Sequence, residues 1–397
     1  MSSSPTRSSL RSVALLGFKL GCIAFGGPAA HIAMLRDEVV TRRAWMSDQR
    51  YLDLLGVTNL IPGPNSTEMV MHIGQERAGW KGLVGAGAAF ILPAAFITLF
   101  FAWLYVEYGT TTGGESLLKG IKPVVLAVVL QAVWNLGRTA IKNVLLAAVV
   151  LAVLVLYLLG VNELVLLFGG AALAGLTRLI ADRGGMSGTR ASGVAFLDTG
   201  GIPVSLDRLP IHPLLSLSDP EIAYSGGRLF LTFLKIGGLL YGSGYVLVAF
   251  IRNDFVDRLG WITQQQLLDA VAVGQFTPGP VFTTATFVGY IVGGFSGAVL
   301  ATIAIFLPAF VFVALCHPLI ARLSVIAWVR PILDGVNAAA IGLMVAVAIL
   351  LSRDAIVDPL TGLLAIVALV LLVRYRVNSA LLVLGGGLSG LLFSIWG

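Results

Sequence analysis

Charged residues are scarce in this chain. Of its 397 residues, 12% are charged and 57% are hydrophobic, and the charged share is about half of that in an ordinary soluble domain. The composition therefore excludes a water-soluble globular protein. Residues 83–106 and 377–396 carry no charge, and residues 144–159 are apolar throughout. Because about 20 apolar residues span a bilayer as a helix, we predict an all-α integral membrane protein with roughly 10 to 12 hydrophobic segments.

Cysteine is almost absent as well. Cys22 and Cys316 both lie in apolar segments, which excludes a disulfide framework and a cysteine metal cluster. The chain lacks the zinc-protease motif His-Glu-x-x-His, the nucleophile elbow Gly-x-Ser-x-Gly and a phosphate loop; the nearest strings, "HIGQE" and "GWKGLVG", have the wrong spacing. These absences argue against an enzyme and a nucleotide-driven pump, and no motif indicates a cofactor or a metal.

The net charge of +6 belongs to loops that flank membrane segments. No stripe of Lys and Arg interleaved with aromatic residues appears, so nucleic acid is not an expected partner. The short basic N-terminus leads into an apolar segment without a convincing cleavage site, which predicts an uncleaved first membrane element. The expected partner is the lipid bilayer, and the sequence leaves open whether the chain forms a homodimer.

The chain contains two copies of one unit. Adding 216 to each number from Lys19 to Pro64 pairs the residues without a gap, with 15 identities in 46 positions, and an offset of 215 continues the match from Gly74 to Ile141. We predict an N-terminal repeat over residues 1–180, a linker over 181–227 that is rich in Gly, Pro and Ser, and a C-terminal repeat over 228–397. Duplicated helical membrane proteins are typical of secondary transporters.

Loop charges favour repeats of opposite orientation. Residues 36–50 contain four Arg, whereas the equivalent residues 252–266 contain two; residues 159–161 contain none, whereas residues 374–376 contain two. A third pair of loops, 107–122 and 322–337, ties at two basic residues each. Because cytoplasmic loops carry the excess of Lys and Arg, the first two differences predict an inverted repeat.

Each half contains two breaks in its apolar pattern. The first breaks are Phe25-Gly26-Gly27-Pro28 and Tyr241-Gly242-Ser243-Gly244, and the second are the Pro-Gly-Pro motifs at 62–64 and 278–280. A break at membrane depth is tolerated only inside protein or along a wet cavity, and a helix that resumes after Pro presents free N–H groups to an anion. Simple Pro and Gly kinks are the alternative. We interpret the breaks as a cradle for an oxyanion, with these candidate ligands: Gly26, Gly27, Pro62, Gly63, Pro64, Asn65, Ser66, Thr67, Pro278, Gly279, Pro280, Thr283 and Thr284.

Ionisable residues inside apolar segments are further candidates. Lys19 and its equivalent Lys235 each place an ammonium where it costs about 2.5–3.5 kcal/mol, so each snorkels to the interface or supplies positive charge to a shared cavity. Glu68, His72 and Glu76 follow at i, i+4 and i+8 on one helical face. This stripe is a candidate proton path, although Glu76 also fits a helix leaving the membrane.

Several motifs occur together in the chain: "FGGP" followed by His31, "RDEVV" and "RNDFV", the elements at Trp45 and Trp261, the paired Pro-Gly-Pro, and "FILPA" and "FLPAF". In this combination the chain resembles the chromate ion transporter family of the long, two-domain type. The resemblance implies efflux of chromate across the bacterial inner membrane, driven by the proton motive force, and chromate resistance; it also implies halves of opposite orientation. Sulfate, an isosteric dianion, is an alternative substrate, and a passive anion channel is an alternative mechanism.

The C-terminal half departs from the family pattern. It has Gly-Ser-Gly where the first half has Gly-Gly-Pro, and Leu247 occupies the position of His31. The residues alone predict a transporter of an oxyanion; chromate is what the resemblance adds.

Overall fold

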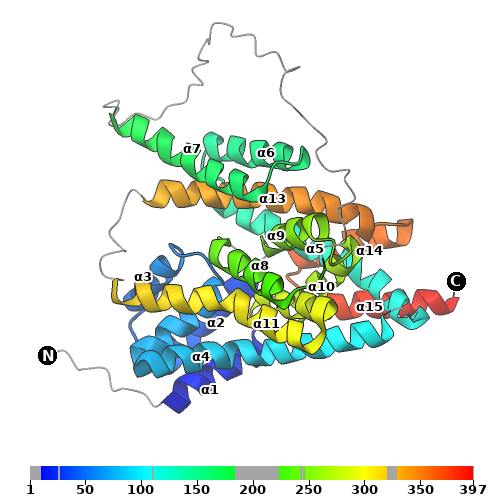
Figure 1. The fold of residues 1–397 in the computed structure, drawn as a ribbon, viewed down its shortest axis with the longest axis horizontal. Coiled ribbons are helices and arrows are strands. Elements are labelled where there is room, and N and C mark those ends of the chain that lie inside the picture. The colour runs from blue at the N-terminus through cyan, green and yellow to red at the C-terminus, as the bar shows by residue number, and fades with distance from the viewer. Residues whose placement is uncertain are drawn as a thin grey trace, which may run out of the picture.

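A computed structural model describes residues 10–25, 27–109, 111–183, 223–241, 244, 246–319 and 329–396, and these residues form helices joined by short turns (Figure 1). The helices of the N-terminal half are α1 (Leu10–Ile23), α2 (Gly27–Arg36), the π-helical η1 (Asp37–Arg42), α3 (Asp48–Thr58), α4 (Asn65–Tyr108), α5 (Thr112–Ala140), α6 (Val144–Leu158) and α7 (Glu163–Arg183). Most of the predicted linker, residues 184–222, lies outside the described residues.

The C-terminal half repeats this order. Its helices are α8 (Gly226–Leu239), α9 (Leu247–Ile251), the π-helical η3 (Arg252–Arg258), α10 (Gln264–Phe276), the 3-10 turn η4 (Val281–Thr283), α11 (Thr284–Cys316), the 3-10 turn η5 (His317–Leu319), α13 (Val329–Ala355), α14 (Pro359–Arg374) and α15 (Ser379–Trp396). The fold is therefore all-α with two homologous halves, as predicted.

Helix starts are duplicated together with the sequence. Ser47 caps α3 and its equivalent Thr263 caps α10, while Asn143 caps α6 and its equivalent Asp358 caps α14. In each case the side-chain oxygen accepts a hydrogen bond from a backbone N–H three residues further on, which satisfies a donor that the helix itself cannot pair. The same local chemistry thus starts the same helices in both halves.

The long helices α4 and α11 are hairpins of two helical arms. Gly79 in α4 has φ 61° and ψ −150°, and its equivalent Gly294 in α11 has φ 60° and ψ −151°; this left-handed conformation is one that glycine adopts readily. Residues eight apart in a straight helix are about 12 Å apart. Here a Cβ on Gly74 would lie 2.3 Å from the carbonyl oxygen of Gly82, so the short arm folds back onto the long one.

The hydrophobic content resides in helices of membrane-spanning length. Asn65–Tyr108, Thr112–Ala140, Val281–Cys316 and Pro331–Ala355 are long and apolar enough to cross a bilayer. Shorter apolar helices are Val144–Leu158, Glu163–Thr177, Pro359–Arg374 and Ser379–Ser394. Together these segments make the chain a multi-pass membrane protein.

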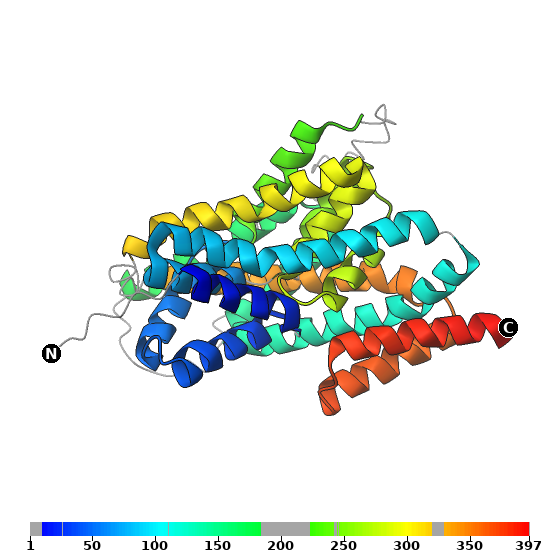
Figure 2. The same ribbon diagram turned by 90° about the horizontal axis from the view of Figure 1, so that it is seen from below.

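Equivalent helices run in opposite directions. In Figures 1 and 2, α4 runs from left to right and α11 from right to left, and α5 and α13 are opposed in the same way. A two-fold rotation that relates the halves therefore has its axis across the helices rather than along them. For helices that span a membrane, this axis lies in the membrane plane, which makes the halves inverted repeats.

Helices from both halves mix in two bundles. The core bundle contains α1–α4 and α8–α11, held by contacts of α1 with α4, α8 with α11 and α4 with α11. The flanking bundle contains α5–α7 and α13–α15, held by contacts of α5 with α13, α14 and α15 and of α13 with α6 and α7. Figure 1 shows α6, α7 and α13 above α1, α4 and α11. All four predicted breaks belong to the core bundle.

Candidate functional site

The breaks of the two halves are joined by a pair of reciprocal hydrogen bonds. The N–H of Gly63 donates to the carbonyl of Leu240 at 2.9 Å, and the N–H of Gly279 donates to the carbonyl of Ala24 at 2.9 Å. Because Gly279 is the equivalent of Gly63, and Leu240 the equivalent of Ala24, these are the same bond made twice across the two-fold axis. The Pro-Gly-Pro motif of each half thus meets the first break of the other half.

The glycine of each Pro-Gly-Pro motif is required by space and by conformation. Gly63 has φ 142° and Gly279 has φ 92°, values that residues with a Cβ rarely adopt. A Cβ on Gly63 would lie 2.2 Å from Oε1 of Glu68, and one on Gly279 would lie 2.8 Å from Cβ of Ala94. The Glu68 carboxylate therefore packs directly against the backbone of the first motif.

A small pocket lies where the breaks meet. It is lined by Pro28, His31, Gly63, Pro64, Asn65, Ser66, Gly244, Pro280, Val281 and Phe282, so both halves contribute to it. Its volume is about 20 Å³, close to the space that one water molecule needs. A tetrahedral oxyanion has four oxygen atoms, and the pocket in this conformation is too small to admit one.

His31 connects three parts of this site. Its Nε2 lies 2.9 Å from the carbonyl oxygen of Ala24, the same oxygen that accepts from Gly279, and its Nδ1 lies 3.2 Å from Oγ of Ser66. A carbonyl only accepts, so Nε2 carries the proton and the Ser66 hydroxyl donates to Nδ1. The sequence analysis cited His31 only as a family motif; its position three residues after the Pro of "FGGP" was the available signal.

The first turn of α4 presents donors toward the pocket. No side chain caps this helix end at Pro64, so the N–H groups of Asn65 and Ser66, which line the pocket, have no partner within the helix. Asn65 donates from its amide to Oδ1 of Asn59 at 2.7 Å. Thr67 is fully buried, and its hydroxyl has no hydrogen-bond partner among the described residues. The predicted cradle at this motif therefore coincides with the pocket.

The C-terminal motif contributes less polar chemistry. Thr283 donates its hydroxyl to the carbonyl of Pro280 at 2.9 Å, and Thr284 donates to Val281 at 2.8 Å. Both protons are already used, and neither threonine lines the pocket. Pro280 reaches the lining, whereas Pro278 is buried outside it.

The remaining residues of the first break are placed only in part. Gly27 begins α2 and has φ 78°, and Pro28 lines the pocket while Pro62 is half-buried beside it. Gly26, Gly242 and Ser243 lie outside the described residues.

The two intramembrane lysines have acidic partners within their own repeats. Lys19 forms an ion pair with Glu38, and Nζ of its equivalent Lys235 lies 2.7 Å from Oδ1 of Asp254, the equivalent of Glu38. Neither lysine lines the pocket at the breaks; Lys235 instead lines a separate surface pocket with Arg258. The contact with an anion that we predict for both lysines stays a prediction.

The acidic stripe begins at the pocket and ends at a charged pair. Both oxygens of the buried Glu68 lack a hydrogen-bond partner among the described residues. His72 stacks on His317 of η5, with their Nδ1 atoms 3.2 Å apart, and Nε of Arg50 lies 3.1 Å from Oε1 of Glu76. The sequence analysis missed His317, because the contact joins residues 245 positions apart.

Two inverted helical repeats whose broken helices meet in a pocket at the repeat interface define a class, the helical membrane proteins with secondary-transporter architecture. The family described as chromate transporter matches residues 11–176 and again residues 227–391. The chain belongs to this chromate transporter family.

Curated relatives agree over almost the full length. The "Chromate transport protein" of Cupriavidus metallidurans is 30% identical over 388 residues, which are 96% of this chain and 92% of that protein. The protein of the same description from Pseudomonas aeruginosa is 32% identical over 382 residues, covering 94% and 89% of the two chains. A "Probable chromate transport protein" of Synechococcus elongatus is 28% identical over 364 residues, covering 91% and 89%. No solved structure matches the chain.

Proposed function

We propose that the chain is a secondary active transporter that exports chromate across the bacterial inner membrane, is driven by the proton motive force and confers chromate resistance. The family membership supports chromate as substrate. The observation that carries the proposal is the pocket itself. Gly63 and Gly279 each donate a hydrogen bond to the opposite half, and these bonds place the start of α4 beside the Pro-Gly-Pro motif of the other half.

The pocket chemistry suits a dianion. Its described lining contains no carboxylate, and it offers backbone N–H groups at the positive end of a helix dipole. The Ser66 hydroxyl adds a donor when it turns from Nδ1 of His31 toward the anion. Hydrogen-bond donors fixed around an anion replace the water that the anion loses on leaving solution. Sulfate has the same charge and shape, so the same donors accept it.

Glu68 is the proposed coupling residue. Its carboxylate lies against Gly63 and next to the anion pocket, so a negative charge there opposes anion binding. A group that gains and loses a proton at this position links proton movement to anion movement. His72 and Glu76 continue from Glu68 along the same helical arm, toward His317 and Arg50.

Flux in reconstituted vesicles tests this function. Vesicles loaded with chromate should export it against a concentration gradient, and an uncoupler should abolish that uphill movement. Downhill movement alone, unaffected by the uncoupler, would make the protein a passive channel. If external sulfate does not compete with chromate, sulfate is excluded as a second substrate.

A matched pair of serine variants tests the pocket. Ser66→Ala removes one donor worth about 0.5–1.5 kcal/mol, so KM for chromate should rise roughly twofold to twelvefold. The control is Ser296→Ala, because the exposed Ser296 bonds only to the carbonyl of Gly293, far along α11 from the pocket. An equal KM in both variants would place the anion elsewhere.

A further inference from the structure

Within each bundle, ion pairs occur at corresponding places on both sides of the two-fold axis. In the core bundle, the ion pair of Lys19 with Glu38 is repeated by Lys235 with Asp254. In the flanking bundle, Lys142 pairs with Asp334 at 2.6 Å. At the opposite end Lys119, the equivalent of Asp334, pairs at 2.6 Å with Asp358, one residue beyond Val357, the equivalent of Lys142.

The hydrogen bond from Lys119 lowers the pKa of Asp358 to about 2, so this carboxylate stays ionised at any physiological pH. Each end of the flanking bundle thus has one lysine–aspartate ion pair between its helices.

The junction between the bundles is not symmetric. Helix α10 of the core bundle packs against α5, α13 and α15 of the flanking bundle, and α9 packs against α13. At the centre of this junction lies Asp269 of α10, which is 1% exposed. Its Oδ1 is 3.6 Å from Nζ of Lys122 on α5, and its Oδ2 accepts from the Tyr105 hydroxyl at 3.0 Å.

The equivalent junction on the other side is open. The equivalent of α10 is α3, which packs on α4 and has no comparable contact with α5, α7 or α13 among the described residues. The equivalent of Asp269 is Asp53, and the equivalent of Lys122 is Asn337. Asp53 accepts only from Gln49 one turn before it on α3, at 3.0 Å, among the described contacts. The contact between Asp269 and Lys122 that closes the α10 side therefore has no counterpart on the α3 side among the described residues.

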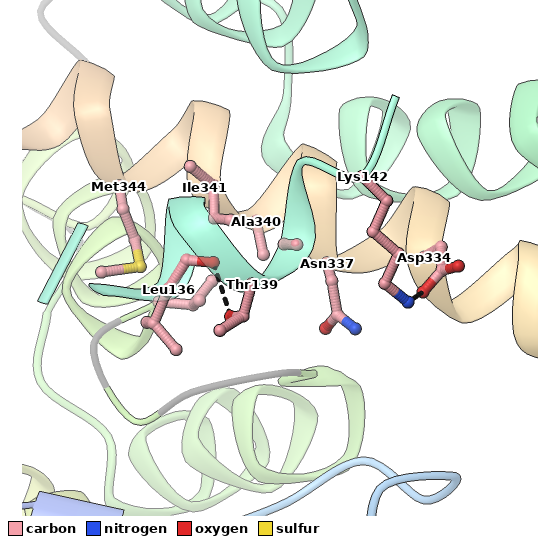
Figure 3. Close-up of a pocket in the computed structure, with 10 residues that line it drawn as sticks. Leu136, Thr139, Lys142, Asp334, Asn337, Ala340, Ile341 and Met344 are labelled. Atoms are coloured by element: carbon pink, nitrogen blue, oxygen red, sulfur yellow. Dashed lines mark hydrogen bonds and ion pairs between the residues drawn. The ribbon is translucent and has the colours of Figure 1, made fainter. Parts of the chain in front are cut away.

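A second pocket occupies the place of the missing contact (Figure 3). It has a volume of about 150 Å³ and is lined by Leu136, Thr139, Ala140, Lys142, Val246, Asp334, Asn337, Ala340, Ile341 and Met344. Figure 3 shows Asn337 pointing into it from α13, beside the Lys142–Asp334 pair. Val246 in its wall is two residues from Gly244 of the pocket at the breaks, so this opening leads toward the proposed anion site.

We propose that α10 and α3 dock alternately on the flanking bundle, and that the described conformation is the state with α10 docked and the α3 side open to solution. In the state of opposite access, α3 docks on α13, Asp53 meets Asn337, the pocket of Figure 3 closes, and Asp269 separates from Lys122. The inference rests on the proposed transport function, for which it supplies the moving interface.

The residues at the two junctions make the states unequal. Burying a carboxylate without a partner is unfavourable, and a cation offsets that cost better than a neutral amide does. Asp269 has Lys122, whereas Asp53 would meet only Asn337. The closed junction at α10 is therefore the more stable one in the absence of substrate, and Asn337→Lys should reduce this bias.

Cross-linking of a cysteine pair tests the second state. In a chain with Cys22→Ser and Cys316→Ser, the pair Asp53→Cys and Asn337→Cys should join through a short thiol cross-linker. These positions lie in different halves, so after cleavage at a protease site inserted between the halves only a cross-linked chain runs as one band. Cross-linking should stop transport, and a reducible linker should restore it once reduced. The additional change Lys122→Gln should raise the cross-linked fraction severalfold.

The control pair is Asp53→Cys with Asp358→Cys. Asp358 is paired to Lys119, and Lys119 is about 30 Å along α5 from Thr139 in the pocket wall. This pair should not cross-link in either state. Absence of the Asp53–Asn337 cross-link under every condition, in protein that still moves chromate, would overturn the alternating junction. Absence of chromate flux in the unmodified protein would instead count against the proposed function.

Labelling of one cysteine in the pocket wall gives an independent test. Thr139→Cys in the pocket wall should react with a membrane-impermeant maleimide. Adding Asn337→Lys gives Asp53 a cation, so the pocket should be closed in a larger share of molecules and labelling should fall by up to about twofold. Adding Asp53→Asn to this variant should restore labelling. Unchanged labelling in the Asn337→Lys protein would refute the proposal even if the double-cysteine variant failed to fold.

Discussion

Gly63→Ala should destabilise the fold strongly, although it adds only one methyl group. A non-glycine residue at φ 142° is strained by about 1–3 kcal/mol, and the new Cβ would lie 2.2 Å from Oε1 of Glu68, which adds overpacking of at least about 1 kcal/mol. We expect Gly63→Ala to lower the free energy of unfolding by roughly 2–4 kcal/mol, because the Gly63 bond to Leu240 must shift as well.

The assay is thermal unfolding in detergent, followed by chromate flux in vesicles. Gly56→Ala on α3 is the matched control: a Cβ there meets nothing within 4 Å, and alanine in place of glycine favours a helix by about 1 kcal/mol, so the sign of its effect is opposite. Gly63→Ala combined with Glu68→Ala removes the overlap and leaves the backbone strain, so it should recover part of the loss. Wild-type stability of Gly63→Ala would refute the assigned geometry.

Three further predictions address charge, coupling and orientation. Lys19→Ala should abolish most chromate flux while the chain stays inserted, because a dianion needs fixed positive charge to leave water; normal flux in a Lys19→Glu, Glu38→Lys exchange would reduce the lysine to a structural partner of Glu38. Glu68→Gln should alter the pH dependence of chromate flux, and an unaltered profile with wild-type flux would remove Glu68 from coupling. Cysteines at the equivalent positions Asp48 and Gln264 should react with impermeant reagents from opposite sides of the membrane; reaction of both from one side would contradict the inversion.

The repeat made much of the fold predictable. An offset read from 15 identities located both breaks. The structure also repeats the ion pair of Lys19 at its equivalent, Lys235. What the sequence analysis did not assign were the partners of these lysines. Glu38 and Asp254 are acidic at equivalent positions, and this was the signal that pointed to them.

Contacts between the halves could not be predicted in this way. Nothing in the local pattern indicates that His72 reaches His317 or that Lys122 reaches Asp269, because such pairs depend on how two helices cross after folding. The reversal at Gly79 was hidden too, because the residues on both sides of it form helices and the turn is made by the backbone of Ala78 and Gly79 alone. The site was predictable where it repeats, and the junction was not, because it is the part that breaks the symmetry.

The reciprocal bonds of Gly63 and Gly279 have a consequence for any attempt to divide the chain. A half inserted by itself would hold a glycine N–H and a break carbonyl at membrane depth with no water to pair them, at several kcal/mol each. Only a second half in the opposite orientation offers the matching groups. Separately produced halves should therefore be stable in the membrane only when two of them pair in opposite orientations. The covalent link between the halves supplies one copy of each in every molecule.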